Sequence, residues 1–352
     1  MKKIVLAFDS FKGCITAKEA CDAAAMGVLS VCPEATVVQM PMSDGGEGLV
    51  KCVCQIIPTQ TISIRVHGPL KEDIMAEYAL SIDGRTAYTE MAAASGLTLV
   101  PQDRRNPMVT TTYGVGEMIA DAVRRGCKTI IMGLGGSATC DGGRGMIMAL
   151  RDNDCLNPDC DVIAACDVSN PLFGRNGAAY IFAPQKGATP EQVALLDNQL
   201  RTFARETELA GIASPSLADY PGAGAAGGLG YALLAYLKAE LHSGIDIMLD
   251  IANFEEAIKD ADLVVTGEGK SDEQTLMGKV PHGVLRRCKK LGVPVWLLSG
   301  SIEDTSGILT KSFDFIRSIN DGDNRPISVL LQADVAKENL TKTMKNLIIK
   351  RQ

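Results

Sequence analysis

The sequence lacks the features that would place a protein in a membrane or on a nucleic acid. None of its apolar runs approaches the roughly 18 residues that cross a bilayer, and residues 4–8 form too short a run for a signal-peptide core. Acidic residues outnumber basic ones, 42 to 35, so the chain of 352 residues carries a formal net charge of -7. An acidic protein is not attracted to nucleic acids or anionic membranes. We therefore expect a cytoplasmic protein that binds a small molecule, with its oligomeric state left open.

Zinc-binding and disulfide patterns are also missing. The eleven cysteines contain no C-x-x-C pair, and the three histidines lie far apart in the sequence. Structural zinc sites need closely spaced ligands, and an odd number of cysteines without a secretion signal is typical of reduced thiols. The common nucleotide-triphosphate loop, G-x-x-x-x-G-K-[ST], is absent too. Gly269-Lys270-Ser271 matches its end, but Val264 stands where the first glycine is required.

Strand-like and helical patterns alternate along the chain, which predicts an α/β protein with a largely parallel sheet. Thr16 and Glu19 form a possible capping box at the start of the first helix. The chain length favours two domains, because one domain usually takes about 100 to 200 residues. Strands are expected at 3–8 and 36–40, then in a second domain at 61–66, 75–80 and 86–89, and again at 261–265, 293–298 and 313–316, where the chain is expected to rejoin the first domain.

The most informative segment is the glycine-rich loop at 133–145, GLGGSATCDGGRG. It follows a strand-like apolar run at 129–132 and leads into another apolar segment at 146–150. A strand that runs into a glycine-rich loop and then a helix is a common phosphate site, because free amides and the positive helix end share the negative charge. The loop therefore predicts a phosphorylated ligand.

Five loops combine glycine with an acid, a lysine or a hydroxyl, and most of them follow a predicted strand: 9–13, 43–48, 133–145, 167–171 and 267–274. Ligands of open α/β sheets bind beyond the carboxyl ends of the strands, so these loops can converge on one crevice. Phosphoryl transfer needs cations near the transferred group and carboxylates that hold Mg²⁺ or accept a proton. The chain offers Lys12, Lys186 and Lys270 as cations, and Asp9, Asp44, Glu47, Asp141, Asp167, Glu268 and Asp272 as carboxylates.

Two other functions compete with phosphoryl transfer. The segment 222–227, GAGAAG, matches the dinucleotide pattern G-x-G-x-x-G and leads into an expected apolar helix at 231–241, which would suit an oxidoreductase. That pattern needs a strand before it, whereas residues 213–221 contain two prolines, so a flexible start of a helix is the better interpretation. A non-catalytic nucleotide sensor is the other alternative, and the many lysines and carboxylates in the loops argue against it.

Taken together, the loops resemble the type I glycerate kinases, a bacterial family, from one end of the chain to the other. The resemblance rests on the ordered blocks IVLAFDSFKGCITAKEA, PMSDGGEG, ASGLTLVP, RNPMVTTTYGVGEMI, GLGGSATCDGGRGM, ACDVSNPLFG, APQKGATPEQV, PGAGAAGGLGYALLA, ADLVVTGEGKSDEQTLMGK and GVPVWLLSG. One departure from the family is a shortened segment at 151–161.

The resemblance implies a two-domain α/β fold and a reaction. A flavodoxin-like parallel-sheet domain is expected from both chain ends, residues 1–65 and 250–352, with an inserted mixed α/β domain at 66–249. The implied reaction transfers a phosphoryl group from ATP to D-glycerate, giving 2-phosphoglycerate and ADP, with Mg²⁺, in an interdomain cleft.

Roles are then assigned to individual residues as a hypothesis. ATP phosphates are expected on the 133–145 loop, at Gly133, Gly135, Gly136, Ser137 and Thr139. Lys12 and Lys270 are expected to neutralise charge, and Asp167 or Asp272 to orient and deprotonate the attacking hydroxyl. Asp44, Glu47 and Glu268 are the metal candidates, and Asp9, Ser10 and Asn170 the glycerate candidates.

Overall fold

A computed structural model of the chain describes residues 2–11, 13–46 and 48–351. Lys12 and Glu47 lie outside the described residues. The chain divides into two compact units: unit 1 comprises residues 1–44, 51–57 and 245–352, and unit 2 comprises residues 45–50 and 58–244. These boundaries fall a few residues before the positions 65 and 250 expected from the sequence, because the first strand of the second sheet already begins at Thr59. Each unit is described separately below.

Unit 1 contains a five-stranded sheet in which every neighbouring pair is parallel, in the order β13-β11-β9-β1-β2. Numbered along the chain this order is 2-1-3-4-5, that of flavodoxin-like folds, so the predicted parallel α/β class is confirmed. The strands are β1 (Lys3–Phe8), β2 (Thr36–Gln39), β9 (Leu263–Gly267), β11 (Val295–Ser299) and β13 (Phe315–Ser318), with the short parallel pair β10 (Lys270–Ser271) and β12 (Ser301–Ile302) beside them.

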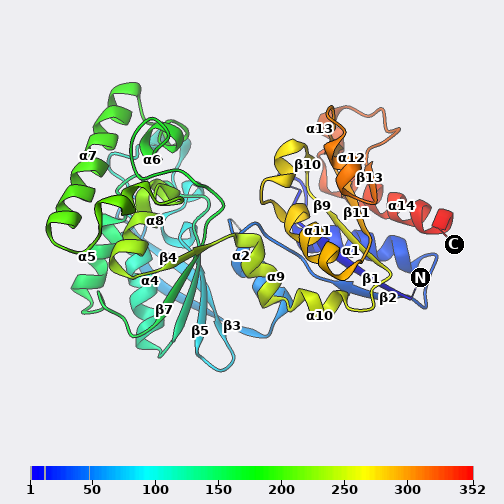
Figure 1. Ribbon diagram of the computed structural model, residues 1–352, viewed down its shortest axis with the longest axis horizontal. Coiled ribbons are helices and arrows are strands. Elements are labelled where there is room, and N and C mark those ends of the chain that lie inside the picture. The colour runs from blue at the N-terminus through cyan, green and yellow to red at the C-terminus, as the bar shows by residue number, and fades with distance from the viewer. Residues whose placement is uncertain (1, 12, 47, 352) are drawn as a thin grey trace. The chain divides into compact units, whose positions relative to one another are not determined.

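Helices cover both faces of this sheet. Ile4, Leu6 and Phe8 alternate along β1 and pack into a buried cluster with residues of α1 and α14, which run beside each other in Figure 1. Helix α11 contacts β1, β9 and β11. Thr16 and Glu19 form the expected capping box at the start of α1. The helical elements are α1 (Ala17–Leu29), α2 (Leu49–Ile56), α9 (Gly244–Ile251), α10 (Phe254–Ile258), η5 (Glu273–Leu276), α11 (Val280–Leu291), α12 (Ile308–Ser312), α13 (Ile327–Leu330) and α14 (Ala333–Arg351).

Unit 2 contains a six-stranded mixed sheet in the order β3-β4-β5-β6-β7-β8. The pairs β3-β4 and β4-β5 are antiparallel, and the pairs from β5 to β8 are parallel. The carboxyl ends of β5, β6 and β7 therefore lie at one edge of the sheet. The strands are β3 (Thr59–His67), β4 (Asp73–Ser81), β5 (Thr86–Glu90), β6 (Thr129–Gly133), β7 (Asp161–Ala165) and β8 (Glu240–His242).

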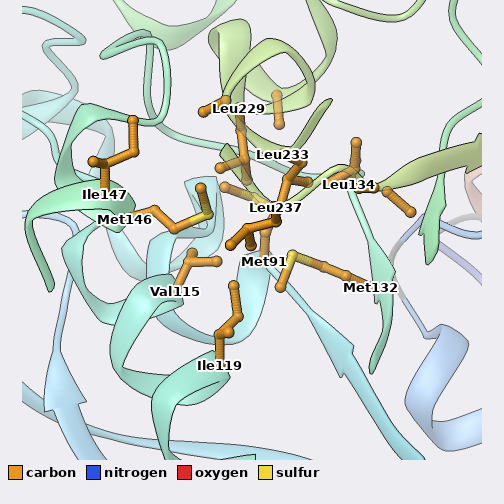
Figure 2. Packing of buried hydrophobic residues seen from close by; sticks show 14 of the residues in the cluster. Met91, Val115, Ile119, Met132, Leu134, Met146, Ile147, Leu229, Leu233 and Leu237 are labelled. Carbon is orange, nitrogen blue, oxygen red and sulfur yellow. The ribbon is translucent and has the colours of Figure 1, made fainter. Parts of the chain in front are cut away.

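The core of unit 2 lies between the sheet and its helices (Figure 2). Met132 and Leu134 point from the sheet side towards Met146 on α5 and Leu233 on α8. Such dense apolar packing holds the strand ends in place. The helical elements are α3 (Ala92–Ser95), η1 (Leu97–Leu99), η2 (Gln102–Arg104), α4 (Tyr113–Arg124), α5 (Arg144–Asp152), α6 (Ala178–Phe182), η3 (Pro184–Lys186), α7 (Pro190–Leu209), η4 (Pro215–Asp219) and α8 (Ala225–Tyr236).

The helix expected at 231–241 is wrong in its second half. Helix α8 ends at Tyr236, and residues 240–242 form strand β8, which pairs with β7. The apolar run is continuous because both segments are packed on the core, so hydrophobicity alone does not separate the helix from the strand. Across the described residues, we find no helix with the length and apolar character needed to cross a bilayer.

Candidate functional site

The loops after β1 and β9 bring two predicted carboxylates together in unit 1. Phe8 and Gly267 are register partners at the ends of these strands, and the Asp9 amide donates to the Gly267 carbonyl at 3.0 Å. Asp9 and Glu268 each come directly after one of these neighbouring strands, so they lie side by side at the carboxyl edge of the sheet. Both residues are 6% exposed. The order of the sheet reverses between β1 and β9, which is where ligands bind in folds of this class.

Glu268 is held by its own loop and by a lysine that the sequence did not single out. Its Oε1 accepts hydrogen bonds from Ser271 Oγ at 3.1 Å and Thr275 Oγ1 at 2.6 Å. Its Oε2 lies 3.4 Å from Nζ of Lys279, the residue before α11. Lys279 belongs to the block GEGKSDEQTLMGK, so its position was visible, but its contact with a buried carboxylate depends on the folded loop.

The two catalytic candidates of this loop have defined partners. Asp272 caps η5 by accepting from the Gln274 amide at 2.9 Å. Its carboxylate oxygens lie 4.0 Å from the ammonium groups of Lys270 and Lys279. Lys270 is more exposed and pairs with Glu303 at 2.7 Å, which raises the pKa of Lys270. Lys279 is the less exposed cation of the two and the one in contact with Glu268.

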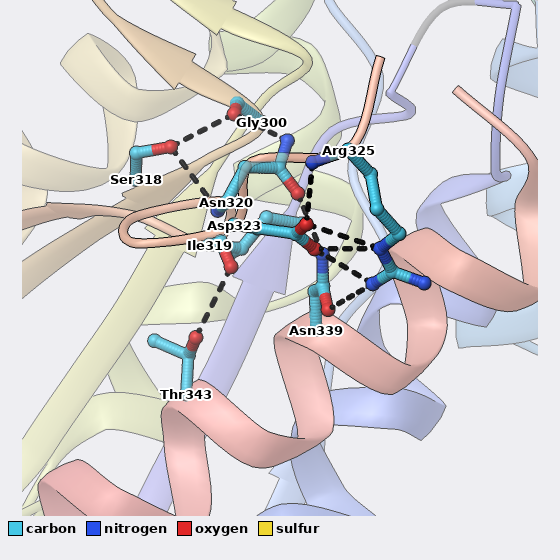
Figure 3. Close-up of polar contacts among 8 residues, drawn as sticks. All are labelled: Gly300, Ser318, Ile319, Asn320, Asp323, Arg325, Asn339 and Thr343. Atoms are coloured by element: carbon cyan, nitrogen blue, oxygen red, sulfur yellow. Dashed lines mark hydrogen bonds and ion pairs between the residues drawn. The ribbon is translucent and has the colours of Figure 1, made fainter. Parts of the chain in front are cut away.

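A polar network beyond β13 fixes the turn that follows β11 (Figure 3). The Gly300 carbonyl accepts from Ser318 Oγ at 2.9 Å and Asn320 Nδ2 at 2.8 Å. Asn339 on α14 donates to Asn320 at 2.8 Å and to Asp323 at 3.0 Å, and Arg325 lowers the pKa of Asp323. Because the Gly300 amide donates to the Glu268 carbonyl, this network also steadies the Glu268 loop.

In unit 2, the 133–145 loop leaves the carboxyl end of β6 as predicted. Gly133 is the register partner of Glu90 on β5 and of Ala165 on β7. Gly136 has a left-handed backbone, with φ of 74°, which glycine adopts readily. Among the described residues, the amides of Gly135 and Gly136 donate to no protein acceptor. Free amides on a glycine-rich turn can bind an anion.

The second half of the loop does not offer its amides in the same way. The Asp141 carboxylate accepts from the amides of Gly143 at 3.1 Å and Gly145 at 3.2 Å, and from the amide and hydroxyl of Thr112 at 2.9 and 2.8 Å. The Met146 amide donates to the Thr112 hydroxyl at 3.0 Å. The amides at the start of α5 thus already donate to side chains of the protein itself, and a contribution of this helix end to phosphate binding stays a prediction.

Replacing Asp141 with Asn should destabilise the protein by about 2 kcal/mol, because hydrogen bonds to a charged acceptor contribute about 1.5 to 3 kcal/mol. The side-chain NH2 of Asn would face the amide and hydroxyl donors from which the Asp141 carboxylate now accepts hydrogen bonds. Urea unfolding measures the change. Asp152→Asn is the control, since Asp152 lies on the same helix and accepts one exposed bond from Tyr113. Equal stability of the two variants would contradict the capping role of Asp141.

Beneath the first half of the loop lies a buried lysine. Lys186, at the end of η3, is 2% exposed, and its Nζ donates to Ser137 Oγ and to the Thr139 carbonyl, both at 2.6 Å. Burial lowers the pKa of Lys186 to about 8, although Cys140 and Asp141 act in the opposite direction. The hydroxyl of Thr139 is also buried and has no partner among the described residues. The loop therefore rests on a cation whose burial is unfavourable by itself.

The glycine-rich segment at 222–230 supports the same loop from the other side. Gly227 has φ of 70°, and a Cβ there would lie 2.0 Å from the Thr139 carbonyl oxygen. Its carbonyl accepts from the Gly142 amide at 3.0 Å. The segment is preceded by η4 and not by a strand. This arrangement agrees with the helix-start interpretation and not with a dinucleotide fingerprint.

The remaining candidates lie near these strand ends or on the segment between the units. Asp167 follows β7, is exposed and accepts from the Gly244 amide at 3.1 Å. Asn170 donates to the Asn176 carbonyl at 2.8 Å. The Ser10 amide donates to Asp9 at 2.6 Å, and Asp44 is half-buried at the end of the first stretch of unit 1. No group of three or more His, Cys, Asp or Glu side chains that could hold a metal occurs in the described parts of the chain.

The whole chain matches a known family. The sequence profile described as the glycerate kinase family matches residues 4–155 and 151–351. The chain belongs to this family. The two matched pieces overlap at 151–155, within the segment at 151–161 that the sequence analysis identified as shortened. Membership makes the protein a kinase, so the predicted enzyme class is confirmed.

Relatives cover nearly the full chain. A glycerate kinase of Bacillus subtilis is 44% identical over 91% of this chain and 91% of its own, and a glycerate 2-kinase of Escherichia coli is 44% identical over 86% of both. The crystal structure of a protein described as glycerate kinase 2 from Salmonella typhimurium LT2 is 37% identical, covers 99% of this chain and 98% of its own, and superposes with a TM-score of 0.85. The predicted α/β fold class is thereby confirmed.

Proposed function

We propose that this protein transfers the γ-phosphoryl group of ATP to D-glycerate, giving 2-phosphoglycerate and ADP, in the cytoplasm. Membership of the glycerate kinase family and the names of the relatives support the acceptor. The observation that carries the proposal is the buried ammonium of Lys186 under a loop with free glycine amides. A fixed cation beside free amides suits a developing phosphate charge, because it needs no rearrangement during the reaction.

The ATP phosphates would bind the first half of the 133–145 loop. The amides of Gly135 and Gly136 would donate to phosphate oxygens, and Ser137 would add its hydroxyl. Lys186 would keep Ser137 and the Thr139 carbonyl in place through its two hydrogen bonds. Its positive charge would also raise the potential at the loop, and this effect is stronger in a buried setting than in water.

Glycerate would be recognised by Asp9, Ser10 and Asn170. Asp167 and Asp272 are the two candidates for orienting and deprotonating the acceptor hydroxyl, and a carboxylate in either position can accept that proton. Asp272 is held by its bond from the Gln274 amide, and Asp167, which is exposed, by its bond from the Gly244 amide. Lys270, and Lys12 as predicted from the sequence alone, would neutralise charge on the substrates.

Mg²⁺ is proposed to accompany ATP, since it neutralises charge on the phosphate oxygens in phosphoryl transfer. Such an ion keeps several waters and needs only one or two protein carboxylates. Asp44, which is half-buried at the end of the first stretch of unit 1, and Glu47, a candidate from the sequence, would supply such a carboxylate. Glu268 fits less well, because its oxygens accept from two hydroxyls and pair with Lys279.

Purified protein is expected to release ADP from ATP only when D-glycerate is present, with 2-phosphoglycerate as the product. A coupled ADP-release assay with D-glycerate, L-glycerate and tartronate measures the dependence, and phosphorus NMR gives the position of the phosphate. In the same assay, Asp167→Asn and Asp272→Asn identify the proton acceptor, because only the variant that lacks it should lose turnover while it still binds glycerate.

Other outcomes would point to the alternatives. An absorbance change with NAD(P)H would support an oxidoreductase, and ATP binding without ADP release would support a nucleotide sensor. ADP release that does not depend on glycerate would contradict the proposed acceptor. That nucleic acids are not partners stays a prediction from the net charge of -7.

A further inference from the structure

Unit 2 contains an open cavity of about 460 Å³ that none of the roles above uses. It lies where the turn around η2 meets the start of α7, and its polar lining includes Asp103, Arg104, Arg105, Asn106, Thr189 and Gln192. A volume of this size is within the range of small-ligand sites. Arg105 is the first residue of the block RNPMVTTTYGVGEMI and Arg104 precedes it; the sequence analysis assigned neither arginine a role.

The polar groups of the cavity wall differ in how they are used. Thr189 and Gln192 form the capping box of α7. The Asn106 side chain accepts from the Met108 amide at 3.1 Å. Over the described residues, neither Arg104 nor Arg105 forms an ion pair with a protein carboxylate, although Asp103 lines the same cavity. Two guanidiniums against one carboxylate leave the cavity with an excess positive charge.

Arg105 carries a more specific signal. Its Nε is buried and has no hydrogen-bond partner in the described part of the chain. A buried donor without an acceptor is unfavourable by about 1 to 3 kcal/mol, and by more in a charged group, so the protein alone does not fully satisfy the hydrogen-bonding capacity of this guanidinium. Guanidinium groups present a planar set of donors that matches the oxygens of phosphate and carboxylate.

The position of Arg105 is fixed through the residue after Lys186. Gly187 also lines the cavity, has φ of 94°, and a Cβ there would lie 2.3 Å from the Arg105 carbonyl oxygen. The Arg105 backbone therefore packs directly on the segment that carries Lys186. The cavity and the 133–145 loop are parts of one packed region of unit 2.

We infer that this cavity is an oxyanion site, in which Arg104 and Arg105 bind a phosphate or carboxylate group of a small phosphorylated or acidic molecule. Arg104 and Arg105 both line the cavity, and each would donate to oxygens of that group through the guanidinium atoms that reach it. The inference does not depend on which acceptor the enzyme phosphorylates.

The test uses inorganic pyrophosphate as the probe and the full-length protein. Isothermal titration calorimetry should show pyrophosphate binding in the low millimolar range or tighter, weakened at least tenfold in Arg105→Gln and in Arg104→Gln. Arg205→Gln is the matched control, because Arg205 is an exposed arginine on α7 that does not line the cavity, and its affinity should equal that of the wild type. Arg104 is exposed, so its variant tests the site even if Arg105→Gln does not fold.

Two results would overturn the inference. One is wild-type protein that does not bind pyrophosphate, and the other is equal binding by the wild type and both cavity variants, which would place the anion elsewhere. The source of the oxyanion is read from kinetics. A raised KM for ATP alone in Arg104→Gln assigns it to the nucleotide, and a raised KM for glycerate alone assigns it to the acceptor. If the wild type binds pyrophosphate but does not phosphorylate glycerate, the proposed function fails and the oxyanion site stands.

Discussion

Replacing Lys186 with Met should lower kcat/KM by about 10³-fold and leave the protein folded. Loss of one preorganised electrostatic group in an active site reduces the rate by about 10²- to 10³-fold. Here the variant would also free Ser137 and the Thr139 carbonyl from the bonds that hold the loop. Stability should change little, because the lost hydrogen bonds are offset by removal of a buried charge. Steady-state kinetics and urea unfolding measure the two effects.

The pH dependence of stability gives a second readout of the same variant. The pKa of Lys186 is lowered by burial from an ordinary 10.5 to about 8, so between these values the unfolded state binds more protons than the folded state. The contribution of Lys186 to the free energy of unfolding must therefore rise with pH between about 8 and 10.5. Below pH 8 the unfavourable burial is present in full. The difference between wild type and Lys186→Met isolates this slope.

Lys238→Met is the matched control for these measurements. Lys238 also makes two hydrogen bonds within unit 2, to the backbone carbonyls of Ile212 and Ala235, but neither bond involves the glycine-rich loop at 133–145. Its variant should keep normal kinetics. Near-normal kcat/KM in Lys186→Met, or an equal loss in both variants, would mean that Lys186 has a structural role only.

Replacing Gly227 with Ala should lower the free energy of unfolding by about 4 kcal/mol. The left-handed backbone at φ of 70° disfavours any side chain by about 1 to 2 kcal/mol. In addition, the new Cβ would lie 2.0 Å from the Thr139 carbonyl oxygen and 2.7 Å from the Cys140 Cα, both of which are parts of the backbone. The loop would have to move, and overpacking of this kind typically adds 1 to 3 kcal/mol. Urea unfolding measures the loss.

Gly211→Ala separates the two causes. Gly211 has nearly the same φ, 69°, but no atom lies within 4 Å of the position its Cβ would take. We expect a loss of about 1 kcal/mol there, from the backbone alone. If the two alanine variants were equally stable, the close approach between Gly227 and the loop would not matter. Reduced activity in Gly227→Ala alone would connect this packing to the phosphate loop.

Local patterns predicted the elements that carry the site. The strand at 3–8, the capping box at Thr16 and the loop at 133–145 could be predicted, because strand alternation and helix capping depend on residues that are close in sequence. The same patterns predicted where the strands end. They indicated that Asp9 and Glu268 would lie at the carboxyl edge of a sheet, and the pairing of β1 with β9 makes them neighbours.

The roles of individual charges could not be predicted in the same way. From the sequence, Asp141 could equally be a catalytic carboxylate. In the structure it accepts hydrogen bonds from amides at the start of its own helix and from the amide and hydroxyl of Thr112. Lys279 and Lys186 look like any other lysines in glycine-rich blocks. Their importance comes from contacts with Glu268 and Ser137, which belong to distant parts of the chain.

The sequence by itself determined the α/β class, the position of the glycine-rich loop at 133–145 and the family. Only the tertiary structure decided that Lys186 is buried beneath that loop, that Asp141 accepts the amides of its own helix start, and that Arg105 Nε finds no acceptor among the described residues. The physical reason is the distance along the sequence over which each effect acts. Propensity and capping act over a few residues, whereas burial and hydrogen-bond satisfaction depend on neighbours brought together from distant segments.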